Sequence, residues 1–95
     1  MKGVFLFYHI EYEEEVIQAL QNAGINAYTK WEKVLGKGEK SEPKLDTAVW
    51  PGFNGAFFIV LKEEDERQLA EKLKDIQQRH NIGVAVFSFP IERII

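Results

Sequence analysis

The chain has 95 residues, of which 45% are hydrophobic and 28% charged, and its formal net charge is −3 at pH 7. These values predict a single small globular domain over residues 1–95 and argue against a nucleic-acid partner, because proteins that bind a phosphate backbone usually present a basic surface. The absence of cysteine excludes disulfides, thiolate metal sites and thiol nucleophiles, and it suits a reducing compartment. The apolar run Gly3–Ile10 is too short for a membrane span. We therefore expect a soluble, unprocessed, cytoplasmic protein.

The first half of the chain predicts a strand, a helix and a second strand. Val4–Ile10 is short, β-branched and aromatic, which favours a buried strand. Over Glu13–Ala23 apolar residues recur at helical spacing, and Gly24 then supplies a C-terminal stop. Ile25–Leu35 alternates in part, which is typical of a half-exposed strand.

The second half repeats this pattern of strand, helix and strand. Ala56–Leu61 predicts a third strand, Asp65–Arg79 a second helix with one apolar stripe, and Val84–Phe89 a fourth strand. The succession of strand, helix, strand, strand, helix and strand is that of a ferredoxin-like α+β fold. We expect two helices on one face of a four-stranded, mainly antiparallel sheet, with a long loop between the second and third strands.

The predicted strands lack the alternation of a sheet that has one face in water. Apolar residues occupy both parities in the first, third and fourth strands, so the face away from the helices is also expected to be hydrophobic. Such a patch exceeds what a monomer usually exposes, which predicts self-association. The alternative is that the loop or the tail Ile91–Ile95 folds back over the sheet. The residues expected on this face include Phe5, Phe7, Phe58 and Val60.

The loop over residues 36–55 is the strongest candidate for a functional segment, because connections of this length in compact domains are usually functional or disordered. Gly36 and Gly38 allow close approach of a ligand to the backbone, and Lys37 and Lys40 can reach an anion. These four residues are the candidate ligand-binding set. The alternative is an ordinary flexible exit from the second strand.

The distal half of the loop carries a second candidate function. Trp50 and Phe53 flank a proline and a glycine, and stiff apolar side chains of this kind are typical of a recognition surface. We expect these two residues to contact a partner protein. The alternative is that both dock on the edge of the domain and restrain the loop.

Catalysis has little support in the sequence, and we expect no enzyme and no catalytic residue. His9 and His80 are the only imidazoles, and neither Ser41 nor Ser88 lies in a nucleophile motif. His9 beside Glu11 is a possible metal ligand or base, but a local hydrogen bond explains it as well. The acidic runs 11–15 and 63–66 suit the positive ends of the two helix dipoles, so no metal site is predicted from them.

In the order of its predicted elements and in two motifs, the chain resembles the PII signalling superfamily. The resemblance lies in the layout of the whole chain and in two short motifs, Ala23-Gly24-Ile25 and the glycine pair of Gly36-Lys37-Gly38, which corresponds to the opening of the mobile T-loop. It implies a homotrimer of ferredoxin-like subunits that binds an adenine nucleotide in clefts between subunits and contacts target proteins through the T-loop. By this resemblance Gly36, Lys37 and Gly38 line the nucleotide cleft.

The chain departs from the PII pattern at three places. Lys40 stands where PII proteins carry a ligand-contacting glutamine, and the segment 80–84 replaces a glycine-rich, lysine-containing phosphate loop. Arg93 alone stands in for the basic residues of the C-terminal segment. These departures predict a changed or absent ligand, so the cofactor is unknown.

Two further functions remain open from the sequence. One is a CutA-like trimer that binds a divalent metal through His9, His80 and acidic side chains at the helix starts. The other is an adaptor module whose loop binds a protein and no small ligand. Ligand titration and partner capture distinguish the three.

Overall fold

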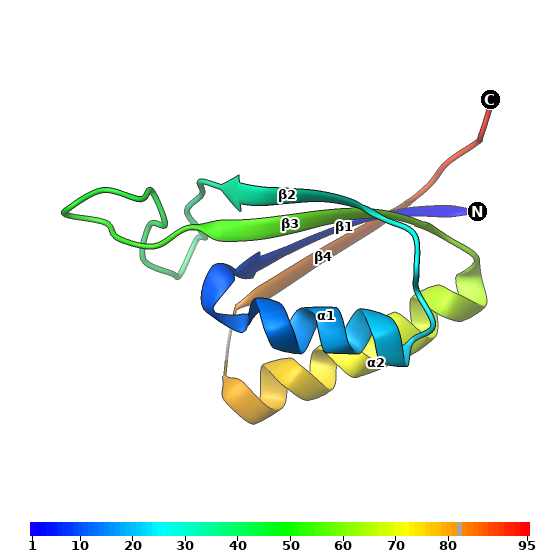
Figure 1. Cartoon of the computed structure of the whole chain (residues 1–95), viewed down its shortest axis with the longest axis horizontal. Helices are drawn as coiled ribbons and strands as arrows, with labels where there is room; N and C mark the ends of the chain where they lie inside the picture. Colours follow the sequence, from blue (N-terminus) through cyan, green and yellow to red (C-terminus); the bar gives the residue numbers. More distant parts are fainter. Residues whose placement is uncertain (82) are drawn as a thin grey trace.

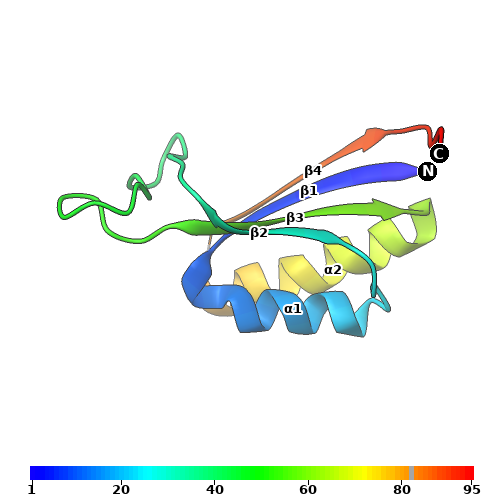
Figure 2. The same ribbon diagram turned by 45° about the horizontal axis from the view of Figure 1, so that its top comes forward.

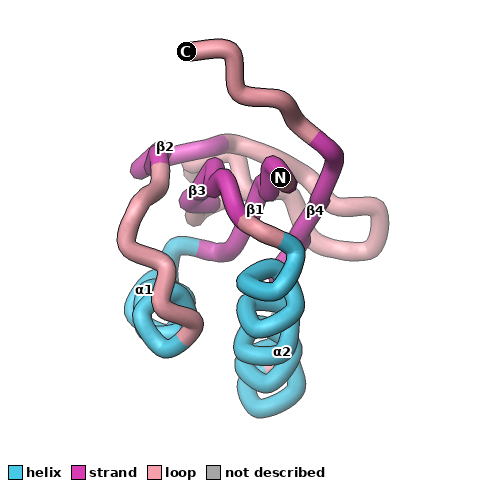
Figure 3. The backbone as a smooth tube through the Cα atoms, turned by 90° about the vertical axis from the view of Figure 1, so that its right-hand side faces the viewer, coloured by secondary structure: helices cyan, strands magenta, loops and turns pink. Residues whose placement is uncertain are grey.

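The computed structural model describes residues 1–81 and 83–95, which form two layers (Figure 1). One layer is a four-stranded sheet in the order β2-β3-β1-β4, in which every neighbouring pair is antiparallel. The other layer is a pair of helices that lie side by side beneath the same face of the sheet (Figure 3). The predicted ferredoxin-like α+β fold is confirmed. The elements are β1 (Lys2–His9), the 3-10 turn η1 (Ile10–Tyr12), α1 (Glu13–Asn22), β2 (Thr29–Val34), β3 (Asn54–Leu61), α2 (Glu63–His80) and β4 (Val84–Pro90).

The core lies between the helices and the sheet. Alternate residues of β1 point into it, and the helices meet them with apolar stripes at the spacing that one helix face requires. Each large side chain buried in this way contributes roughly 1.5–3 kcal/mol to folding. Neither α1 nor α2 is long and apolar enough to cross a membrane. The core includes Val4, Leu6, Tyr8, Val16, Leu20, Phe57, Ile59, Leu69, Leu73 and Ile76.

The face of the sheet away from the helices is lined with aromatic residues, and we call it the open face. The register pairs Phe5 with Phe58 on one side and with Phe87 on the other, so all three side chains lie on this face. Val60 and Phe87 are 48% and 60% exposed. Figure 2 shows both helices on the opposite side of the sheet. The hydrophobic second face predicted from the strands is confirmed.

The C-terminal tail covers the open face only at one end, where Ile91 Cγ2 is 3.0 Å from the position that a Cβ on Gly3 would take. It meets the sheet where the Ile91 amide donates to the Met1 carbonyl, and it then leaves the body of the protein (Figure 1). Ile94 and Ile95 are 90% and 99% exposed. Among the described residues, the fold-back of loop or tail considered as an alternative is therefore not found.

The strand boundaries differ from the prediction in the segments that lead to the loop. Ile10 belongs to η1 and not to the first strand, because the chain turns after His9. The second strand begins at Thr29 instead of Ile25, since Ile25 is buried and its amide closes the end of α1 on the Leu20 carbonyl. Leu35 lies beyond the end of that strand.

The loop is two residues shorter at its C-terminal end than predicted, because β3 begins at Asn54. Asn54 and Gly55 pair with His9 and Tyr8 across the β1–β3 register. Gly55 leaves room for the Tyr8 ring, since a Cβ at this position would lie 2.6 Å from the Tyr8 Cζ. The second helix likewise begins at Glu63 rather than Asp65, with its carboxylates in the first turn.

Candidate functional site

A cavity of about 730 Å³ lies at the end of the sheet where β1 stops and the loop begins. It is bounded by the ends of β1 and β2 and by the starts of β3 and β4, which the antiparallel sheet brings to one edge. A β-bulge between Trp31 and Val34 shifts the register of β2 just before the chain enters the loop. Tyr8, His9, Tyr12, Lys37, Ser41, Lys44 and Asn54 are among the lining side chains.

Three of the four residues predicted to bind a ligand line this cavity. Gly36, Lys37 and Gly38 form part of its wall, whereas Lys40 lies outside the lining and is exposed. The structure thus brings the glycine pair and its intervening lysine to the cavity and leaves Lys40 on the surface of the loop.

Sequence reasoning missed two lining residues from the same loop, Ser41 and Lys44. Lys44 is held at the cavity by a backbone bridge, in which its amide and the Gly36 amide each donate to the other residue's carbonyl at 2.7 and 3.0 Å. Ser41 is held by a hydrogen bond of 3.1 Å from the Gly38 amide to its hydroxyl. A serine three residues after a glycine is a turn signal, but nothing in the sequence indicated that Gly36 and Lys44 are paired.

The charged groups of the cavity favour an anion. Lys37 and Lys44 are basic residues of its lining, and Glu11 is an acidic one. No second carboxylate is among the lining residues. Within residues 1–81 and 83–95, no three histidine, aspartate or glutamate side chains are placed to hold a metal ion together.

His9 connects the cavity to the far end of the loop. Its Nδ1 accepts a hydrogen bond of 3.2 Å from the Glu11 amide, so the neutral ring carries its proton on Nε2. That Nε2 lies 3.0 Å from the position a Cβ on Gly52 would take, and Gly52 has a φ of +87° that favours glycine. The predicted local hydrogen bond of His9 is confirmed. The Tyr12 ring is 6.3 Å from His9 and 6.0 Å from His80 between centroids. Of the two histidines, His9 lines the cavity and His80 does not.

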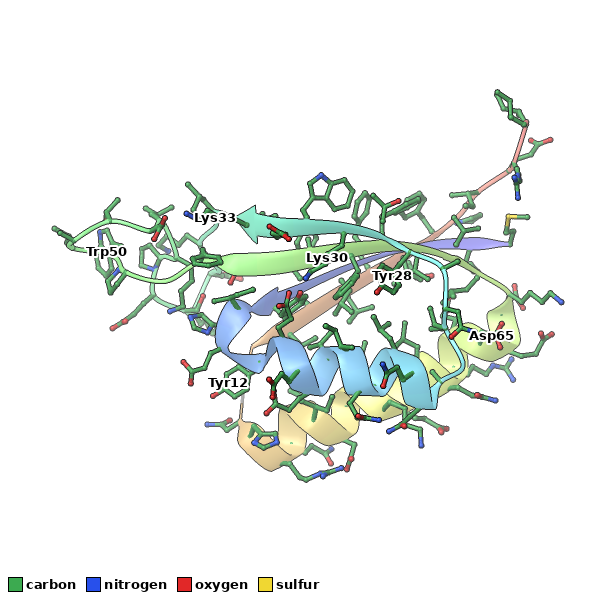
Figure 4. All side chains as sticks on the ribbon, viewed as in Figure 1. Tyr12, Tyr28, Lys30, Lys33, Trp50 and Asp65 are labelled. Carbon is green, nitrogen blue, oxygen red and sulfur yellow. The ribbon has the colours of Figure 1, made fainter. Side chains whose placement is uncertain are left out.

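A hydrogen-bonded trio beneath the cavity fixes the strands that frame it. The Tyr8 hydroxyl donates to Glu13 Oε1 at 2.8 Å, and Lys30 Nζ lies 2.8 Å from the same oxygen (Figure 4 labels Lys30). The Lys30 ammonium holds the pKa of Glu13 below its ordinary value, and burial raises the pKa of Tyr8 above its own. The trio therefore joins β1, α1 and β2 through one carboxylate.

The distal part of the loop, residues 46–52, forms a compact turn that projects from the body (Figure 1). The Asp46 amide donates to the Gly52 carbonyl at 2.9 Å. Within the turn, the Thr47 amide donates to the Trp50 carbonyl at 3.0 Å, and the Trp50 amide donates to the Thr47 hydroxyl at 2.9 Å. Asp46 also forms an ion pair with Lys33 of β2.

Trp50 and Phe53, the two predicted partner contacts, lie at different places. Trp50 lies in the projecting turn (Figure 4) and is 40% exposed. Its neighbour Val49 is 74% exposed. Phe53 is half-buried at the base of the loop. Lys33 Nζ lies 4.9 Å from the centre of the Phe53 ring, and the Phe53 carbonyl accepts a hydrogen bond from the Ile10 amide. The two side chains therefore do not form one surface.

Several solved structures of PII-like proteins have a similar fold. CPII, a nitrogen regulatory PII-like protein from Thiomonas intermedia K12 solved with ADP, AMP and bicarbonate, is similar with a TM-score of 0.72 and 19% identity, over 97% of this chain and 88% of that chain. The apo form of CPII gives a TM-score of 0.66 at 18% identity, over 98% and 92% of the two chains. A protein described as PII-like from Thermus thermophilus gives 0.66 at 19% identity, over 93% and 83%.

These identities establish likeness of fold alone. No curated protein matches the chain. A family model, that of the nitrogen regulatory protein P-II, matches the whole of residues 1–95. The chain therefore belongs to the P-II family of nitrogen regulatory proteins.

Proposed function

We propose that this protein is a PII-like regulator that binds a small anionic effector, an adenine nucleotide, in the cavity beside Gly36–Gly38. The observation that carries the proposal is the meeting of two lysines with a glycine-containing backbone turn at the wall of one cavity of about 730 Å³. Backbone turns of this kind together with ammonium groups bind phosphate and other oxyanions. The similarity to CPII, which was solved with ADP, AMP and bicarbonate, gives the ligand class.

The distribution of charge sets the orientation of the nucleotide. Lys37 and Lys44 lie on the loop side of the cavity, while Asn81 at the C-terminal end of α2 lies on the other side. The C-terminal end of a helix is the negative end of its dipole and disfavours phosphate. The phosphates accordingly lie toward the two lysines, and a diphosphate or monophosphate is favoured over a longer chain because no lysine lies at the start of β4.

The site lies at a boundary between subunits in this proposal. Phe7 and Ala85 line the cavity and also lie next to each other on the open face, where the register pairs them. A second copy packed on the open face would therefore border the cavity and supply one of its walls. Three copies around a symmetry axis, as the PII resemblance implies, would cover three such faces in a closed assembly.

The loop is the proposed contact with a target protein. Its turn presents Val49 and Trp50 on a framework of backbone hydrogen bonds, so little conformational entropy is lost when a partner binds. Phe53 contributes by holding the base of the loop. An adaptor that binds no small ligand would use the same tip, and ligand titration separates the two functions.

The experiment is a thermal-shift titration with ADP, AMP and bicarbonate on the wild type and two single variants. A ligand that binds the folded state raises the melting temperature, and the shift grows with the ratio of ligand concentration to Kd. We expect ADP to raise the melting temperature of the wild type and of Lys40→Ala, whose side chain lies outside the cavity, but not of Lys37→Ala. No shift with any of the three ligands contradicts the proposed function and favours the adaptor.

A further inference from the structure

Two hydrogen bonds within the turn over residues 37–41 occupy polar groups that could otherwise bind a ligand. The Gly38 amide donates to the Ser41 hydroxyl at 3.1 Å, and Lys37 Nζ donates to the Gly38 carbonyl at 3.2 Å. The contact with Ser41 is close, since a Cβ on Gly38 would lie 2.5 Å from the Ser41 Oγ. The Gly38 amide at the cavity wall therefore already donates to a neutral oxygen, the Ser41 hydroxyl.

The Gly36 amide, the neighbouring backbone donor in the cavity wall, is held more firmly than the Gly38 amide. The Gly36 amide is part of the two-way bridge to Lys44, which an anion would have to break. The Gly38 amide, in contrast, is held by a single side-chain hydroxyl that is free to rotate away into water. A ligand can therefore accept a hydrogen bond from the Gly38 amide without unfolding the loop, whereas the Gly36 amide is not free to donate.

Resting on the proposed function, we infer that Ser41 is an internal competitor whose hydroxyl occupies the oxyanion position of the cavity until a ligand displaces it. An anionic oxygen that accepts from the Gly38 amide and from Lys37 Nζ gives both donors a charged acceptor in place of a neutral hydroxyl and a neutral carbonyl. For the Gly38 amide this exchanges a neutral hydrogen bond for a charge-assisted one, which is roughly twice as strong. Ser41 exchanges its internal bond for water. The ligand class is a compact oxyanion, either free or as the phosphate of a nucleotide.

The bridge between Gly36 and Lys44 confines the effect of this exchange. Residues 37–43 lie between the two bridged residues, so loss of the Ser41 contact frees that segment while its ends stay paired. The turn over residues 46–52 is closed separately by Asp46 and Gly52 and keeps its form. Ligand binding thus changes the conformation of residues 37–43 and leaves the rest of the loop as it is.

The test compares ADP and bicarbonate binding, each titrated alone by calorimetry, to the wild type, Ser41→Ala and Ser41→Thr. Removing the competing hydroxyl frees the Gly38 amide, so Ser41→Ala binds ADP about two- to ten-fold more tightly than the wild type. Ser41→Thr keeps a hydroxyl and binds within about two-fold of the wild type. Ser41 is exposed, so both variants are expected to fold, and their melting temperatures without ligand provide the check.

A second readout follows the Gly38 amide directly in the wild type. Its proton resonance is expected to move when ADP or bicarbonate is added, and in Ser41→Ala it starts from a different position because the hydroxyl is gone. Equal affinity of the wild type and Ser41→Ala overturns the inference while leaving the proposed function intact. Weaker binding by Ser41→Ala also overturns it, because the hydroxyl would then contact the ligand. Failure of both probes to bind either protein overturns the proposed function and this inference together.

Discussion

Phe5 and Phe58 pair directly across β1 and β3 with ring centroids 5.0 Å apart, on the face of the sheet that neither helix covers. Phe89 lies 5.9 Å from Phe5 and 6.4 Å from Phe58, so an aromatic cluster spans three strands. A cluster of this size on a surface marks an interface. The Phe7 ring, 5.9 Å from Phe5, extends the cluster to the cavity that Phe7 lines, which is the reason that assembly and ligand binding are linked in this account.

A charge placed on the open face should disrupt the assembly. Val60→Glu introduces a carboxylate opposite Gly3, at the end of the face away from the cavity, where a neighbouring copy would bury it without a partner. The matched control is Val49→Glu, since Val49 is more exposed than Val60 but lies in the projecting turn. Light scattering should give a lower mass for Val60→Glu than for the wild type and an unchanged mass for Val49→Glu. Equal masses for all three proteins would exclude the open face as the interface.

Removal of the Tyr8 hydroxyl should destabilise the fold through the trio beneath the cavity. Tyr8→Phe deletes a hydrogen bond to a carboxylate, which costs about 1.5–3 kcal/mol in the free energy of unfolding. Tyr28→Phe is the control, because Tyr28 is 48% exposed and its ring packs edge-on against Phe57; a change within about 0.5 kcal/mol is expected. Urea unfolding measures both, and equal stability of the two variants would show that the Tyr8 bond is not stabilising.

The same trio predicts a loss of stability in acid. The Lys30 ammonium lowers the pKa of Glu13 in the folded protein from its ordinary value of 4.5, so the unfolded chain binds the proton more readily. The stabilisation is therefore complete above pH 4.5 and is lost as the pH falls through the folded-state pKa. Urea unfolding of the wild type and Glu13→Gln should differ at pH 7 and converge toward pH 3. A difference that stays constant with pH would contradict the assignment.

Gly55 is predicted to be intolerant of any side chain. In Gly55→Ala the new Cβ would lie 2.6 Å from the Cζ of the buried Tyr8 ring, and relief of this clash costs roughly 1–3 kcal/mol. Gly83→Ala is the matched control, because a Cβ there meets no atom within 4 Å. Chemical denaturation should show a loss for the first variant alone. Similar losses for both would mean that the Tyr8 ring moves aside readily.

The sequence predicted the fold well because its helices carry clear periodicity and its strands are short apolar runs. The apolar stripe of α2 specifies a helix and the face it buries, and the aromatic run of β1 specifies a strand. Asn81 ends α2 in the left-handed conformation that this residue tolerates. Gly55 was assigned to the loop because glycine usually signals a turn, whereas here it is a strand residue that accommodates Tyr8.

The candidate site was predicted only where it depends on local chemistry. Gly36, Lys37 and Gly38 were predicted to bind a ligand because glycines next to lysine suit an anion, and the structure places all three at the cavity, where their binding role stays a prediction. Lys44 and His9 were not assigned to it, because their positions depend on a backbone bridge and on the approach of Gly52, neither of which has a sequence signature. Contacts between residues distant in the chain are fixed by the fold and cannot be read from spacing.

Sedimentation equilibrium of the wild-type protein at micromolar concentration tests most directly whether the open face is covered by other copies of the chain. The account predicts a particle of three times the 11.0 kDa of one chain, stable on dilution across that range. A stable particle of 11.0 kDa would contradict it, because the aromatic cluster would then face water and the cavity would have no second subunit at its border.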